Sequence, residues 1–104
     1  MGMFDMFGKI NELKGKLEEV KQRLEGVEVE AQVAGGAIRV VSVASRKVRR
    51  IEVDDDFWAS TEKNEIENLI VECVNLSLEN ADKVSKKEIQ EVTKGMLPDI
   101  PGMF

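Results

Sequence analysis

Five basic side chains in the first quarter of the chain are the first candidates for a binding site. They recur at helical spacing in two rows: Lys9, Lys16 and Arg23 form one row, and Lys14 and Lys21 form the other. Lysine and arginine bind phosphate groups, and phosphate contacts give affinity for a nucleic acid without reading its sequence. The rows therefore indicate a surface for an acidic partner, either a nucleic-acid backbone or an acidic protein helix.

An apolar seam runs between the two rows and predicts the helix that carries them. Its members alternate at spacings of three and four: Met3, Met6, Ile10, Leu13, Leu17, Val20 and Leu24. This heptad pattern predicts a helix over about residues 6–25, which Gly26 ends. A lone chain of 104 residues would struggle to cover such a seam, so we expect a homodimer.

One basic row has an alternative use within the protein. Two sets of side chains share a spacing of seven residues: Glu65, Glu72 and Glu79 on the second predicted helix, and Lys9, Lys16 and Arg23 on the first. Rows of opposite charge can pair across an interface and set the register of two helices. The row of Lys14 and Lys21 matches no such acids, so we expect it to remain free for phosphate.

Further basic residues extend the candidate surface. The densest group is Arg46, Lys47, Arg49 and Arg50, which lie in a predicted turn and the strand that follows it. This group is either a patch for a nucleic-acid backbone or a device that keeps an edge strand from pairing with other strands. The distal helix adds four lysines: Lys83, Lys86, Lys87 and Lys94.

The residue types argue against catalysis. The chain has no histidine, so it lacks the commonest general base and metal ligand. Asp54-Asp55-Asp56 lacks the alternating spacing of a calcium loop and is interpreted as a solvated turn. Gly35-Gly36 lacks the other parts of a phosphate-binding loop, and Cys73 lies on an apolar stripe as a buried thiol. We therefore expect no enzymatic activity, no cofactor and no metal site.

Charge and composition bound the location and the partners. The net charge is −5, which argues mildly against nucleic acid as the sole partner. The charge is uneven, because residues 1–50 carry 10 basic and 7 acidic side chains, whereas residues 51–104 carry 5 and 13. One cysteine fits a reducing cytoplasm, and no apolar run is long enough to span a membrane.

The remaining pattern predicts three strands and a second helix. Alternation over residues 27–33, a hairpin at Gly35-Gly36 and strands over 37–44 and 48–53 indicate an antiparallel meander with a bulge near Arg49. The second helix is expected over about residues 61–94, capped by Ser60 or Thr61, with Phe57 and Trp58 plugging the core.

Two features bear on the end of that helix. A capping-box pattern at Ser85 and Glu88 is an alternative point for a break, and prolines at 98 and 101 predict a non-helical tail over 95–104. The order α-β-β-β-α predicts a single α+β domain over residues 1–104.

Several stretches, taken in order, resemble the YbaB/EbfC family of bacterial nucleoid-associated proteins. They are Met6 to Gly8, Gly36 to Val43, Val48 to Asp54, Ile66 to Asn75, and Gly95 to Pro98 with Pro101-Gly102. The resemblance implies a tweezers-like homodimer with helices that project from a shared core. It also implies DNA binding in the cytoplasm and no enzymatic activity. The chain departs from the family pattern at Ala44-Ser45, where members often carry an Asn-Gly turn, and in its acidic second helix.

Two functions follow as hypotheses. The first is a homodimeric nucleoid-associated protein that binds duplex DNA mainly through backbone electrostatics. Its candidate residues are Lys9, Lys14, Lys16, Lys21, Arg23, Arg46, Lys47, Arg49 and Arg50. The alternative is an acidic dimeric protein-interaction module without direct DNA binding, which the net acidity, the apolar seam and the apolar tail favour.

Overall fold

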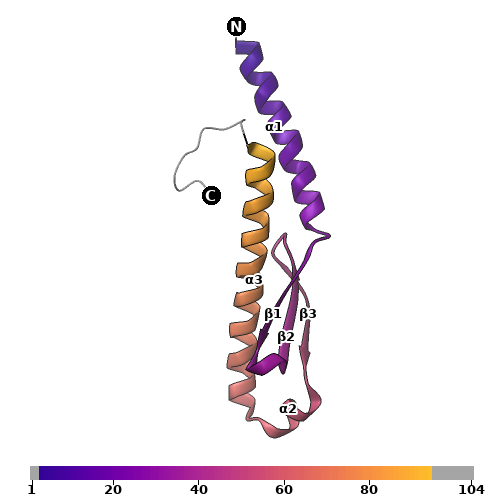
Figure 1. The fold of residues 1–104 in the computed structure, drawn as a ribbon, viewed down its shortest axis with the longest axis vertical. Coiled ribbons are helices and arrows are strands. Elements are labelled where there is room, and N and C mark those ends of the chain that lie inside the picture. The colour runs from indigo at the N-terminus through magenta and orange to yellow at the C-terminus, as the bar shows by residue number, and fades with distance from the viewer. Residues whose placement is uncertain (1–2, 95–104) are drawn as a thin grey trace.

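The computed structural model describes the backbone of residues 3–94 and the side chains of residues 7–94. Its elements are α1 (Met3–Leu24), β1 (Glu28–Val33), the short 3-10 helix η1 (Ala34–Gly36), β2 (Ile38–Val43), β3 (Lys47–Val53), α2 (Asp55–Ser60) and α3 (Lys63–Thr93). The predicted order of a helix, three strands and a long helix is confirmed (Figure 1). The predicted tail and the seam side chains of Met3 and Met6 lie outside the described parts.

The three strands form one antiparallel sheet in the order β1-β2-β3. Alternation along β1 places Ala31 opposite Val40 of β2, so both side chains share one face of the sheet. Gly35 and Gly36 have φ angles of 66° and 94°, which favour glycine, and the predicted hairpin at this turn is confirmed. The pairing of β2 with β3 skips Arg49, so the bulge predicted near that residue is also confirmed.

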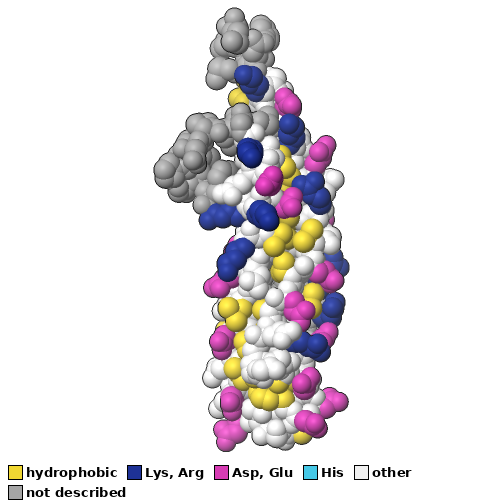
Figure 2. Space-filling model, viewed as in Figure 1, with side chains coloured by type: hydrophobic (Ala, Val, Ile, Leu, Met, Phe, Trp, Pro, Cys, Tyr) yellow, Lys and Arg dark blue, Asp and Glu magenta, His cyan; other side chains and the backbone are white. Residues whose placement is uncertain are grey.

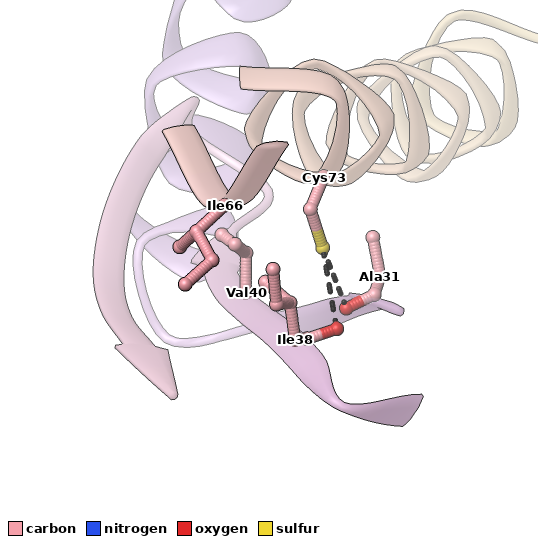
Figure 3. Close-up of a cluster of buried hydrophobic side chains, with 5 residues drawn as sticks. All are labelled: Ala31, Ile38, Val40, Ile66 and Cys73. Carbon is pink, nitrogen blue, oxygen red and sulfur yellow. Dashed lines mark hydrogen bonds between the residues drawn. The ribbon is translucent and has the colours of Figure 1, made fainter. Parts of the chain in front are cut away.

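The main core lies between the sheet and the first half of α3. Ile38, Val40 and Cys73 are fully buried there, next to Ala31 and Ile66 (Figure 3). The Cys73 thiol donates to the carbonyl oxygens of Ala31 and Ile38, at 3.3 and 3.7 Å. Burial raises the pKa of Cys73, which keeps the thiol protonated and unreactive. The prediction of a buried cysteine is confirmed.

The second half of α3 extends past the sheet and packs against α1, which runs antiparallel beside it (Figure 1). Val20 and Leu24 of the seam are buried in a second apolar cluster, whose other members are Ala44, Val27, Val84, Ile89 and Val92. The partner helix of this part of the seam therefore belongs to the same chain. α3 continues through Ser85 and Glu88, so the alternative break there is wrong. The helix continues because α1 covers apolar positions on both sides of that point.

A six-residue helix, α2, occupies the segment between the sheet and α3. Phe57 packs against the main core, whereas Trp58 is 63% exposed, so the predicted plug is right for Phe57 and wrong for Trp58. The predicted cap by Ser60 or Thr61 is also wrong, because α3 begins after Glu62 without a side-chain cap. The Ser60 hydroxyl instead donates to a carbonyl oxygen inside α2, at 2.7 Å.

Candidate nucleic-acid interface

Charge is separated along the long axis of the molecule. Residues 7–25, which comprise α1 from Phe7 and the residue after it, and residues 83–94, which comprise the end of α3 and the residue after it, form one end, the α1 end. It carries nine basic and six acidic side chains. Residues 54–72 form the opposite, acidic end, with seven acidic side chains and one basic. Figure 2 shows basic side chains over the α1 end and acidic side chains around the lower end. The field of the protein therefore attracts a phosphate backbone to the α1 end and repels it from the other.

Every arginine of the described residues is engaged within the chain. Arg23 pairs with Glu88 at 2.8 Å, Arg39 with Glu52 at 2.8 Å, Arg46 with Asp82, Arg49 with the Glu25 carbonyl oxygen at 3.0 Å, and Arg50 with Glu28 at 3.4 Å and Glu52 at 3.0 Å. Exposed contacts of this kind contribute little to stability individually. Each contact nevertheless uses part of a guanidinium group's five N–H donors, and a paired carboxylate offsets the charge of four of the five arginines. The arginines therefore join elements of the fold and offer less net positive charge to a ligand.

The predicted basic cluster from Arg46 to Arg50 lies in the β2–β3 turn and along β3, an edge strand of the sheet. Arg50 reaches across the face of the sheet that is turned away from α3, where it pairs with Glu28 of β1 and Glu52 of β3. The hydrogen bond with Glu52 raises the pKa of Arg50, and Glu28 adds to this effect. Within the described residues, Lys47 is the one cation of the cluster with neither an ion pair nor a side-chain hydrogen bond, because Arg46 and Arg50 form ion pairs and Arg49 donates to the Glu25 carbonyl oxygen.

In the part of the chain that the structure describes, the basic row does not lie along the acidic row that shares its seven-residue spacing. Arg23 pairs with Glu88 instead, and Lys16 lies 3.5 Å from Glu12, one turn away on the same helix. The position of α1 explains the difference. α1 packs against the second half of α3, whereas the acidic row that begins at Glu65 lies on the half that covers the sheet.

The lysines differ from the arginines. At the acidic end Lys63 is exposed without an ion pair; elsewhere in the part of the chain that the structure describes, eight exposed lysines form no ion pair: Lys9, Lys14, Lys21, Lys47, Lys83, Lys86, Lys87 and Lys94. Seven of them lie at the α1 end, and Lys47 begins β3. An unpaired ammonium group can replace a counterion at a phosphate, so these lysines are the cations best suited to DNA.

A groove of about 920 Å³ lies between α1, the β2–β3 turn and α3. Its floor is apolar and is formed by Leu17, Val20, Leu24, Ala44 and Ile89. Its rim is charged and includes Lys14, Lys21, Arg46, Lys47, Glu18, Glu25 and Asp82. Sequence reasoning missed the groove because three distant segments form it, and the apolar seam was its only signal. An apolar floor with a mixed rim suits contact with another protein chain.

The acidic end has a structural explanation in α2. Asp54 precedes this helix, and Asp55 and Asp56 occupy its first turn, where negative charge is favourable.

Among the described residues, no group of three or more potential ligand side chains is arranged to hold a metal ion. No helix in residues 3–94 has the length and apolar character to cross a membrane.

Similarity to known proteins extends over nearly the whole chain. A nucleoid-associated protein of Flavobacterium johnsoniae is 34% identical over 103 residues, which cover 99% of this chain and 95% of that protein. Another, from Methylocella silvestris, is 35% identical over 78 residues, with coverage of 74% and 71%. The crystal structure of an uncharacterized protein from Helicobacter pylori has the same fold, with a TM-score of 0.73, 13% identity and coverage of 84% of this chain and 91% of that one. The profile of one family matches residues 1–96, and the chain therefore belongs to the YbaB/EbfC DNA-binding family.

Proposed function

We propose that this protein is a nucleoid-associated protein that binds duplex DNA, as a homodimer, through lysines of its α1 end. Membership of a DNA-binding family supports the partner. The observation that carries the proposal is the different use of the two basic residue types. All described arginines have partners within the chain, whereas seven exposed lysines of the α1 end have no ion pair among the described residues.

The chemistry of lysine predicts how the DNA is read. An ammonium group is a compact point charge, whereas specific contacts to guanine commonly use the fork of arginine. Lysines that contact phosphates release counterions and give affinity without base recognition. Binding is therefore driven mainly by the DNA backbone, and the acidic end keeps each molecule oriented with its α1 end toward the duplex.

The homodimer part of the proposal is supported by apolar surface that one chain leaves uncovered. α3 packs mainly over β1 and β2, so Val48 and Ile51 on the same side of β3 are 41% and 44% exposed. The apolar groove between α1 and α3 adds to this surface. A second copy related by two-fold symmetry would cover both regions and carry a second set of lysines.

A titration of labelled duplex DNA, followed by fluorescence anisotropy, tests the proposal. We expect binding at low salt and a loss of affinity of about 10³-fold between roughly 50 and 200 mM salt, as for proteins with several phosphate contacts. No binding at the lower salt concentration, or equal affinity at both, would contradict DNA binding through lysines.

A second candidate function is protein interaction without direct DNA contact. The acidic end favours it, because residues 54–72 carry seven acidic side chains beside Trp58, which is 63% exposed. Such a surface suits a basic partner, whose cations could also stack on the indole ring. This function predicts that the protein leaves duplex DNA unbound even at low salt.

A further inference from the structure

The N-terminal part of α1 exposes apolar side chains within the basic end. Phe7 is 59% exposed, and Ile10 is 47% exposed. Single exposed apolar residues are common on proteins, but these two belong to a pattern. They begin a stripe on one face of α1, spaced alternately by three and four residues, which consists of Phe7, Ile10, Lys14, Leu17 and Lys21. Lys14 and Lys21 of the candidate DNA surface therefore share a face with an apolar pair.

The packing of α1 explains why this pair is uncovered. Val20 and Leu24 are buried against α3, Leu17 is half-buried, and exposure then rises toward Ile10 and Phe7. α1 extends past the last turn of α3 (Figure 1). Within the described residues, Phe7 and Ile10 thus belong to neither apolar cluster of the fold.

We propose that Phe7 and Ile10 make an apolar contact with the groove of the duplex whose phosphates the neighbouring lysines bind. This inference rests on the proposed function. Charge decides in favour of DNA, because Lys14 follows the apolar pair on the same face of α1, Lys9 lies on the same turn of the helix, and a DNA groove is bordered on both sides by phosphates. Phenylalanine and isoleucine in such positions wedge against or between base pairs and bend the duplex.

The contact has a signature that separates it from the lysine contacts. A lysine at a phosphate releases counterions, so its contribution to the binding constant depends on salt. An apolar contact releases none, so its contribution is the same at every moderate salt concentration. The lysines therefore set the slope of log K against log salt, whereas Phe7 and Ile10 shift the whole line.

The test uses the full chain with Phe7→Ala and Ile10→Ala together. The matched control is Trp58→Ala, which truncates an aromatic residue of similar exposure, 63%, at the acidic end. We expect the double variant to bind about tenfold more weakly at every salt concentration, with an unchanged slope. We also expect it to bend the duplex less, as measured by energy transfer between dyes at the two DNA ends. The control should match the wild type in both measurements.

Four results would overturn the contact. Wild-type affinity and bending in the double variant would reject it and leave lysine-driven DNA binding intact. A double variant that sediments as a monomer while the wild type is a dimer would assign the pair to contact between copies. Equal weakening by Trp58→Ala would show that the effect is not specific to the α1 end. A wild-type protein that leaves DNA unbound at low salt would reject the proposed function and this contact together.

Discussion

Reversal of charge at Lys14 and Lys21, by the substitutions K14E and K21E, is expected to weaken duplex binding by ~100-fold or more near 0.1 M salt. The proposed dimer carries two copies of each lysine, four side chains in all. Each phosphate contact contributes about 0.9 log unit to the binding constant at that salt concentration. Neither lysine forms an ion pair among the described residues, so the change breaks no such contact within the chain. Fluorescence anisotropy with a labelled duplex measures the effect.

The control for this variant is Lys63→Glu, which reverses the one basic residue between positions 54 and 72. It should bind DNA as the wild type does, because the proposed function places the acidic end away from the duplex. Sedimentation velocity of the Lys14 and Lys21 variant then distinguishes two roles for this pair, which are phosphate contact and packing within the dimer. Loss of DNA binding in an intact dimer supports phosphate contact. Loss of the dimer would instead show that the two lysines act in packing around the groove that they line.

Substitution of Val48 and Ile51 by glutamate, V48E and I51E, is expected to raise the dissociation constant of the homodimer by about a hundredfold or more. Both side chains are over 40% exposed in the single chain, so the fold should tolerate a polar residue there. In the proposed dimer, each glutamate would be buried without a partner, and every 1.4 kcal/mol of that cost weakens association tenfold. Sedimentation equilibrium over a range of concentrations measures the change.

Trp58→Glu is the matched control, since Trp58 is also exposed but lies on α2, away from the groove. It should leave the dimer unchanged. A dimer that persists in the double variant would place the interface elsewhere on the chain. Duplex affinity should fall together with dimerisation, because a monomer presents one set of lysines and does not have the gain from two linked sites.

Local patterns predicted most of the fold. Alternation along β1 and the glycine pair after it are signals of neighbouring residues, and both led to the right elements. α2 was missed because six residues are too short to show helical periodicity. The capping-box pattern at Ser85 and Glu88 is equally local, but the buried positions of α3 that contact α1 extend beyond it, and tertiary packing kept the helix continuous.

The candidate site was less predictable, because the sequence shows which residues carry charge but not which charges meet. Arg23 and Glu88 are 65 residues apart, and Arg46 and Asp82 are 36 apart, so their pairing depends on where α1 and the β2–β3 turn lie against α3. The same placement leaves Ile10 uncovered, although the seam pattern predicts a partner along its whole length. The folded structure is needed to see that the arginines have partners within the chain whereas most lysines of the α1 end have no ion pair among the described residues.

The salt dependence of duplex binding in two variants of equal charge tests most directly whether lysines, and not arginines, bind the phosphates. One variant carries Lys14→Gln and Lys21→Gln, and the other carries Arg39→Gln and Arg50→Gln, whose guanidinium groups both pair with Glu52. Each variant has two fewer positive charges per chain than the wild type. We predict that the slope of log K against log salt becomes shallower in the lysine variant, by about 0.9 for each phosphate that it no longer binds, and stays at the wild-type value in the arginine variant. A shallower slope in the arginine variant, with a wild-type slope in the lysine variant, would contradict phosphate binding by these lysines.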